Sequence, residues 1–410
     1  MSGIWGNRRF TTMFSARVVT NVGDSLYLAA TLWSVHDLSG SPFYTGIGGF
    51  LLYSPEVFQF LTGPLVDRWD LRWTLTGTQL VQAIAVLTIP LAAWTNSLDI
   101  FVVLTVIPTL ALIDQFVYPA QSAALPRIVT EENLVQANSL FSLAYKRVDL
   151  VFKAVGGVLI AMFGAVTLYV FDAVTFLLAA VLFGSVAIPS GGPDSDRSED
   201  RLSEYLDDLR SGVGYVRRTV LTNIIVGAAV ANFVVGGTMA VLPGLADLWG
   251  GPQMYGLLVS ALAAGTLLGA LGASFLHEVR LGYALSVCFA IAAVAFFAAM
   301  RVPRPFASVG LFGLAWIPVG AYNVLMQTLR QTAVPDDLLG RVTAVSTSAS
   351  AVAAPVGSFV AGSAASVVGL ETALTVGSLG FAGVAVLFSV RRRLRVLPPI
   401  GDVSTADIKH

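Results

Sequence analysis

Charge is scarce in this chain. Only 12% of its 410 residues are Asp, Glu, Lys or Arg, which is about half of the roughly 25% that soluble domains carry. The hydrophobic fraction is 55% and the mean hydropathy is +0.76. Apolar runs of about 20 residues, the length that crosses a bilayer, recur along the chain. The composition excludes an ordinary soluble domain and predicts an all-α membrane protein surrounded by the lipid bilayer.

Cysteine is almost missing as well. The single Cys288 excludes an intrachain disulfide and a cysteine-based metal cluster. The chain has no G-x-x-x-x-G-K-[ST] motif, so direct drive by ATP at a P-loop is excluded, and it has no zinc-ligand spacing. Its polar segments are too short for a catalytic domain. We therefore expect neither an enzyme nor a cofactor, a metal centre or a nucleic-acid partner.

Twelve membrane-spanning helices are expected, and the first of them reads as an uncleaved span. They are predicted near residues 10–37, 42–66, 72–95, 98–124, 137–162, 165–188, 218–246, 253–276, 281–300, 305–329, 340–366 and 369–391. Eighteen of the 24 Lys and Arg residues fall on one side of these spans, and only Arg301 and Arg304 fall on the other. The positive-inside rule predicts a cell-membrane protein with both termini in the cytoplasm.

One long connection divides the chain into two halves. It begins with the polar sequence PSGGPDSDRSED and continues over 198–216 with apolar residues three and four apart, the pattern of an amphipathic helix on the membrane surface. We expect a six-helix half at 1–188, a cytoplasmic linker at 189–217, a second six-helix half at 218–391 and a cytoplasmic tail at 392–410.

The two halves resemble each other in sequence. Pro42 and Gly46 recur as Pro252 and Gly256 at the start of the corresponding span of the second half. The segment TEENLVQANSL aligns loosely with PDDLLGRVTAV. The order of these matches along the chain predicts two parallel copies of one six-span unit.

The connection after the second span carries an unusual concentration of charge. The sequence GPLVDRWDLR contains Gly63, Asp67, Arg68 and Arg72. A helix N-terminus near Arg341 is expected on the same face of the membrane. An acid at such an N-terminus gains about 0.3–1 kcal/mol, and an arginine there adds a charge-assisted hydrogen bond.

Twelve spans, a central linker and this connection resemble the major facilitator superfamily. Its signature G-x-x-x-D-[RK]-x-x-x-[RK] is matched by the four residues just named. The segments NVGDSLYLAATLWSVHDLSGSPFYTG and LPRIVTEENLVQANSL resemble the drug:proton antiporter branch with macrolide and siderophore exporters. The resemblance implies twelve helices in two six-helix halves that work by alternating access. It also implies that Gly63, Asp67, Arg68, Arg72 and Arg341 form a cytoplasmic gate.

Ionisable residues inside the predicted spans are concentrated in the first half. A charge at the bilayer centre costs about 2.5–3.5 kcal/mol on insertion scales, so such residues usually face the bundle interior and pair with one another. The spacings place Arg17, Asn21 and Asp24 on one face of the first span. The full set is Arg17, Asp24, Glu56, Asp114, Lys146, Arg147, Asp149, Lys153 and Asp172.

This set has five acids and four bases, so one acid is left over if all pair. An unpaired acid in low dielectric can bind a proton near neutral pH, or it can balance a cationic substrate. Asp24 is the first candidate and Glu56 the second, since both are predicted near the middle of the membrane. The remaining candidates, Asp114, Lys146, Arg147, Asp149 and Lys153, shape the site or its coupling. Asp172 is expected to be structural.

The alternative for these charges is a static ion-pair network that only fixes helix packing. By the family resemblance, the first, fourth, seventh and tenth spans line a central cavity. The polar residues expected to line it are Asn21, Tyr118, Asn323 and Gln327.

These patterns predict a monomeric secondary active transporter that exports a small drug-like or siderophore-like compound by proton antiport. A metal or inorganic-ion exporter is the alternative within transport, because a Gly–Asp pair in the first span also occurs in iron exporters of the superfamily. A transporter-like membrane sensor or binding protein without coupled transport is the alternative of another class.

Overall fold

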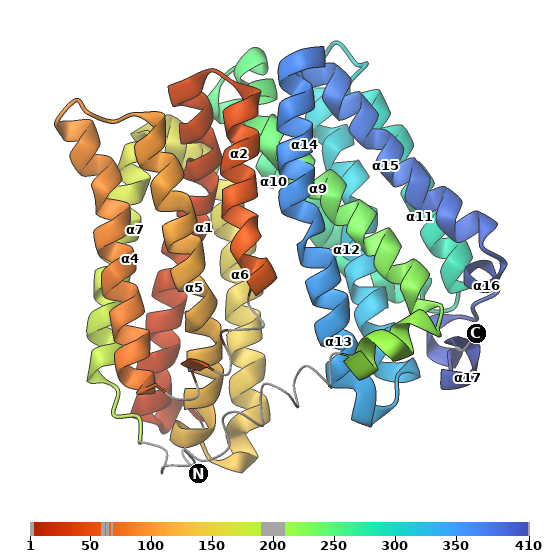
Figure 1. Cartoon of the computed structure of the whole chain (residues 1–410), viewed down its shortest axis with the longest axis horizontal. Helices are drawn as coiled ribbons and strands as arrows, with labels where there is room; N and C mark the ends of the chain where they lie inside the picture. The colour runs from red at the N-terminus through yellow and green to blue at the C-terminus, as the bar shows by residue number, and fades with distance from the viewer. Residues whose placement is uncertain (1–3, 59–61, 63–64, 67–68, 190–209, 409–410) are drawn as a thin grey trace. The chain divides into compact units, whose positions relative to one another are not determined.

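The computed structural model describes residues 4–58, 62, 65–66, 69–189 and 210–408. Its regular secondary structure over these residues is helical, with no strand. Contacts divide the chain into two compact units. One comprises Met1–Gly40 and Leu51–Leu202, and the other comprises Ser41–Phe50 and Ser203–His410. Figure 1 colours the helices along the chain.

In the first unit, long helices pack side by side around α1 (Figure 1). Helix α1 packs against α7, α6 and α5, and α4 packs against α7 and α5. The helices are α1 (Arg8–Ser39), α4 (Leu71–Trp94), α5 (Ile100–Ile128), α6 (Glu131–Phe163) and α7 (Ala165–Ser185), with short 3-10 turns at Ile4–Gly6 and Ser54–Phe58. Asn7, Asp70 and Asp99 accept hydrogen bonds from backbone N–H groups at the starts of α1, α4 and α5, as helix N-caps do.

The second unit repeats this arrangement. Helix α9 packs against α14, α15 and α10, while α11 packs against α15 and α12. Its helices are α9 (Leu221–Trp249), α10 (Pro252–Gly272), α11 (Leu281–Ala299), α12 (Pro305–Ala333), α13 (Asp336–Ala351), α14 (Ala353–Val368) and α15 (Leu370–Val390). Shorter elements are η3 (Ala273–Leu276), α16 (Arg392–Arg395), η4 (Ile400–Asp402) and α17 (Thr405–Ile408).

Helix α2 (Pro42–Tyr53) is divided between the two units. Its first part belongs to the second unit, where the rings of Phe43 and Phe50 each lie 6.2 Å from the ring of Phe359 on α14. The prediction of one helix over 42–66 was wrong, since α2 ends at Tyr53 and a 3-10 turn follows. Pro55 explains this end, because proline has no N–H and clashes with the preceding turn of an α-helix.

Nine of the described helices are long and apolar enough to cross a membrane. These nine and the three helices α1, α2 and α6 occupy the places of the predicted spans. Helices α1 and α6 are long enough but carry the polar and ionisable residues singled out above, and α2 is short. The predicted all-helical membrane fold is thus confirmed.

The two halves share their turn geometry. Gly164 precedes α7 with φ +77°, and Gly369 precedes α15 with φ +88°. Positive φ is accessible to glycine at little cost, so both turns need this residue. Pro42 and Pro252, the prolines of the sequence repeat, both open a helix, where proline is favoured.

Glycines also let α10 and α12 approach closely. A Cβ on Gly265 would lie 2.0 Å from the carbonyl oxygen of Gly313, and one on Gly320 would lie 1.8 Å from that of Thr266. Small residues at helix contacts are the usual means of close packing in membranes.

The last residues of the chain pack back onto the second unit. Val220 N–H donates to the carbonyl of Ile408 at 2.9 Å, and Leu281 N–H donates to that of Pro398 at 3.4 Å. Leu397 and Ile408 are buried. The segment 392–408 therefore joins the start of α9 to the start of α11.

Candidate functional site

The polar face of α1 lies inside the first unit. Arg17, Asn21 and Thr31 are all buried, and Arg17 is only 5% exposed. These residues follow one another at spacings that keep them on one face of the helix. The structure thus turns the predicted polar stripe of α1 towards neighbouring helices.

Arg17 is held by neutral groups. Its Nη1 donates to Thr20 Oγ1 at 3.3 Å, and its guanidinium carbon lies 4.3 Å from the centre of the Tyr145 ring on α6. Its buried Nε has no hydrogen-bond partner among the described residues. A cation over a desolvated aromatic ring gains about 2 kcal/mol. Arg17 thus keeps unused hydrogen-bonding capacity in a buried place.

Asp24 lies at the centre of a group of acids. It is close enough to Asp114 on α5, to Asp149 on α6 and to Arg17 for direct electrostatic interaction. Asp114 also interacts with Arg17. Three of the predicted site acids, contributed by three different helices, are therefore brought together with one predicted base.

Asp149 is tied to α1 by a hydrogen bond. Ser25 Oγ donates to Asp149 Oδ1 at 3.2 Å, and Asn21 Nδ2 donates to the carbonyl of Tyr145 at 3.4 Å. Nearby, a Cβ on Gly156 would lie 2.7 Å from Ala29 Cβ, so α6 approaches α1 closely there. The predicted bases Lys146, Arg147 and Lys153 belong to α6, but their side chains lie outside the described part of the structure.

Asp172, an acid of the predicted intramembrane set that was expected to be structural, interacts with the same group. It is 0% exposed, and it interacts electrostatically with Asp24 and Asp114. It lies on α7, which packs along α1. Gly23, next to Asp24, was a signal in the sequence that a side chain of another helix could approach α1 here. The sequence does not say which helix that is.

Glu56 lies at the margin of this group. It is exposed and belongs to the 3-10 turn Ser54–Phe58. It interacts electrostatically with Tyr53, and Tyr53 interacts with Asp149. One connection from this second candidate to the acidic group thus runs through Tyr53 and Asp149.

The residues expected to line a cavity differ in exposure. Asn21 is buried, whereas Tyr118 on α5 is 55% exposed, and Asn323 and Gln327 on α12 are exposed. Exposed polar side chains on apolar membrane helices usually face a water-filled cavity and not lipid. Gln121, one turn from Tyr118, is buried with an unpartnered Oε1 among the described residues.

Of the residues expected to form a gate, Gly63, Asp67 and Arg68 lie outside the described residues. Arg72 Nη2 donates a hydrogen bond to the carbonyl of Gly184 near the end of α7, where cations are favourable.

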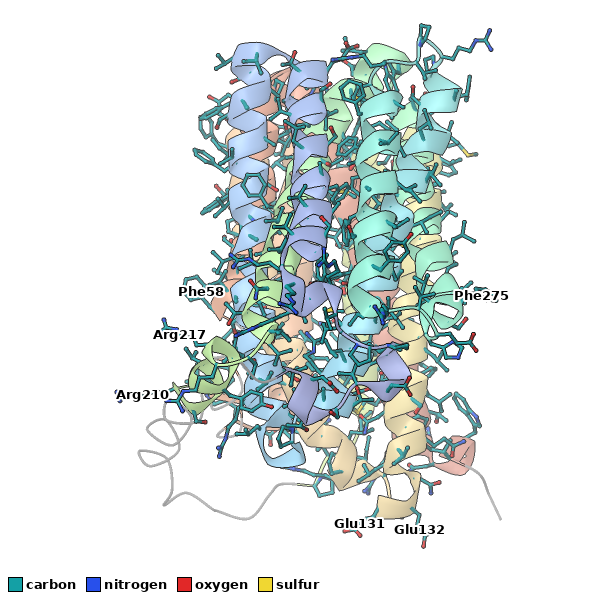
Figure 2. All side chains as sticks on the ribbon, turned by 90° about the vertical axis from the view of Figure 1, so that its right-hand side faces the viewer. Phe58, Glu131, Glu132, Arg210, Arg217 and Phe275 are labelled. Atoms are coloured by element: carbon teal, nitrogen blue, oxygen red, sulfur yellow. The ribbon has the colours of Figure 1, made fainter. Side chains whose placement is uncertain are left out.

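Arg341 lies one turn inside α13, because this helix begins at Asp336 and not near residue 340 as predicted. Its Nη1 donates to Ser211 Oγ at 3.4 Å. Ser211 belongs to a helix over 210–217, which overlaps the end of the amphipathic helix predicted at 198–216. Figure 2 shows Arg210 and Arg217 projecting from this short helix.

No group of three or more His, Cys, Asp or Glu side chains is arranged to hold a metal ion in the part of the chain that the structure describes. Among the described residues, the site is a polar cluster of carboxyl groups and Arg17 inside a bundle of apolar helices.

Residues 5–406 match the family model described as transmembrane secretion effector. The family model and the full-length relatives identify the chain as a membrane transporter of the major facilitator type. The chain belongs to the transmembrane secretion effector family of that superfamily, whose members are membrane transporters and not enzymes.

Named relatives cover most or much of the chain. The MFS-type transporter YvqJ of Bacillus subtilis (strain 168) is 27% identical over 94% of this chain and 92% of its own. The multidrug efflux pump Tap of Mycolicibacterium fortuitum is 27% identical over 93% and 95%. The enterobactin exporter EntS of Escherichia coli O1:K1 / APEC is 26% identical over 68% and 67%.

Solved structures share the fold. A crystal structure of a bacterial homologue of the human lysosomal transporter Spinster has a TM-score of 0.69 and 12% sequence identity. The match covers 96% of this chain and 98% of the other.

Proposed function

We propose that this protein is a monomeric secondary active exporter of small drug-like or siderophore-like organic compounds, driven by proton antiport. The observation that carries the proposal is the group of Asp24, Asp114 and Asp149 around Arg17 inside the first unit. Acids buried in a membrane bundle bind protons or cationic groups, because an isolated charge is costly there.

Asp24 is the proposed coupling residue. It interacts with two other acids and with a base that is already engaged by Tyr145 and Thr20. Repulsion among acids favours the uptake of a proton or a cation by one of them. Asn21 and Ser25 orient this group through their hydrogen bonds to α6. The efflux functions named for Tap and EntS support an organic substrate.

The cytoplasmic gate is a separate proposal. Asp67, Arg68, Arg72 and Arg341 would regulate access from the cytoplasm, where both chain termini would lie. The bond from Arg72 to the end of α7 and the bond from Arg341 to Ser211 support this role, because each fixes a charged side chain next to a helix end or connection.

The test uses purified protein in liposomes with an imposed pH gradient. Tetraphenylphosphonium, erythromycin, enterobactin and Zn²⁺ are added in turn, and proton flux is recorded. We expect an organic compound to trigger flux in the wild type and Asp24→Asn to abolish it. Asp37→Asn, which changes an exposed carboxylate of the same helix, is the control and should leave the flux unchanged. Flux triggered by Zn²⁺ alone, or equal flux in Asp24→Asn and wild type, would contradict the proposal.

A further inference from the structure

Asp172 on α7 is a buried carboxyl with an incomplete set of hydrogen bonds. Its side chain is 0% exposed. Thr175 Oγ1 donates to the backbone carbonyl of Asp172 at 2.8 Å and approaches Oδ1 at 3.4 Å. Oδ2 has no hydrogen-bond partner among the described residues. An ionised carboxylate with an unsatisfied oxygen inside a membrane bundle is strongly unfavourable.

The carboxyl of Asp172 occupies space that α1 leaves open. A Cβ on Gly23 would lie 2.3 Å from Asp172 Oδ1 and 2.0 Å from Thr175 Oγ1. Only glycine therefore fits at this point of α1. Because the next residue is Asp24, the close approach also brings two carboxyl groups of different helices into electrostatic contact.

The second half shows that the helix crossing does not require a carboxyl. Thr175 and Gly380 lie the same number of residues from the starts of α7 and α15, and so do Asp172 and Gly377. At Gly380, a Cβ would meet Val234 Cγ2 of α9 at 2.4 Å. In the second half, α9 and α15 thus pack at the corresponding point through Val234 and Gly380. The packing of two helices at this point does not require a carboxyl group, so packing alone does not explain Asp172.

The described titratable groups that interact with Asp172 are two carboxyl groups and two tyrosines. They are Asp24 and Tyr27 from α1, Asp114 from α5 and Tyr169 from its own helix. Tyr169 O–H donates to Ser34 Oγ at 2.9 Å. Helix α4 also packs on α7, but its described base, Arg72, contacts the far end of α7 at Gly184. Nothing in this described group balances a second negative charge.

We propose that Asp172 is a second proton-binding carboxyl of the transport site and exchanges its proton with Asp24. This inference rests on the proposed proton antiport. In the exchange, the O–H bond of the Asp172 carboxylic acid breaks and an O–H bond forms on the Asp24 carboxylate, so the pair carries one negative charge before and after. Asp172 then stores the proton in the dry interior, and Asp24 passes it to the substrate site.

Infrared spectroscopy of the purified protein tests the proton directly. A protonated carboxyl gives a C=O stretching band distinct from that of a carboxylate. At neutral pH we expect such a band in the wild type and in Asp37→Asn, and a weaker or shifted band in Asp172→Asn. The asparagine keeps the size of the side chain and the Oδ1 acceptor, so a folding defect is not expected, and the melting temperature checks this. An unchanged band in Asp172→Asn would overturn the proposal.

Transport distinguishes this inference from the proposed function. In liposomes, Asp172→Asn should shift the pH dependence of compound-driven proton flux, whereas a residue with a merely structural role would leave the pH profile unchanged. If Asp24→Asn abolishes flux while Asp172→Asn has the wild-type profile, Asp172 is not a proton site although antiport stands. If neither variant differs from wild type, the proposed antiport through these acids fails.

Discussion

At the scale of single residues, several ionisable side chains of the first unit lie close to Asp24. Arg17 contacts an aromatic ring and a hydroxyl, its Nε has no hydrogen-bond partner among the described residues, and it is the one described base that interacts with both Asp24 and Asp114. Such an arrangement is poor as a stabilising ion-pair network, because a buried pair stabilises only when its geometry and hydrogen bonds are complete. It is better suited to exchange of a proton or a ligand.

Gly23 is predicted to be the most sensitive small residue of this region. In Gly23→Ala the new methyl group would overlap Thr175 Oγ1 and Asp172 Oδ1, so α1 and α7 must separate. We expect a lower melting temperature and loss of transport. Gly77→Ala on α4 is the control, because a Cβ there meets nothing within 4 Å. Thr175→Ala added to Gly23→Ala should restore part of the stability, and no recovery would argue against the described contact.

The sequence could place Asp24 and Arg17 on one face of the first span because this signal lies within one helix. A charge in an apolar run and its spacing from the next polar residue can be read without knowing the neighbours. The sequence alone does not reveal the surroundings of Asp172, because the space that its carboxyl occupies depends on the missing Cβ of Gly23 on another helix. The burial of this carboxyl follows from the pairing of α1 with α7, and pairing is a property of three-dimensional structure.

At the scale of elements, the helices begin and end where local chemistry dictates. Most predicted boundaries lie within a few residues of the observed ones because charged caps and glycines interrupt the apolar runs. The fifth span was predicted from residue 137, whereas α6 begins at Glu131. Two other errors have local causes. Pro55 ends α2 within the predicted span, and α13 begins at Asp336, directly after Pro335. The predicted tail at 392–410 contains five buried apolar residues that periodicity could not assign to the core, namely Leu394, Leu397, Ile400, Val403 and Ile408.

The terminal segment 392–408 is predicted to stabilise the second unit. Leu397 is buried and Val396 is 58% exposed, although they are neighbours. Truncating a buried leucine to alanine typically costs about 2–5 kcal/mol, whereas an exposed position changes stability by less than about 0.5 kcal/mol. Leu397→Ala should therefore lower the melting temperature in detergent more than Val396→Ala. Equal effects of the two changes would show that the segment is not packed as described.

At the scale of the whole molecule, the two units share a helix arrangement but differ in their ionisable residues. Both use a glycine of positive φ before their last long helix and a proline at the start of a corresponding helix. Arg17, Asp24, Asp114, Asp149 and Asp172 all lie in the first unit, while the helix crossing at Gly380 in the second unit is apolar. Figure 2 shows Glu131 and Glu132 projecting from the N-terminal end of α6. The proposed topology places this end of the helix in the cytoplasm.

The proposed topology predicts opposite accessibility of two loop positions. In a Cys288→Ser background, Glu132→Cys should react with a membrane-impermeant thiol reagent only in inside-out vesicles. Ser97→Cys, in the connection between α4 and α5, should react only in right-side-out vesicles. Both positions are exposed. The reverse pattern would place the termini outside the cytoplasm.

The central claim is that a substrate and protons compete for the acids around Asp24. The most direct measurement is proton release when tetraphenylphosphonium, or whichever organic compound drives flux in liposomes, binds to the purified protein in weakly buffered solution. The account predicts that binding releases protons from the wild type and releases fewer from Asp24→Asn. Binding of the same compound without proton release, or with equal release from the variant, would contradict the account.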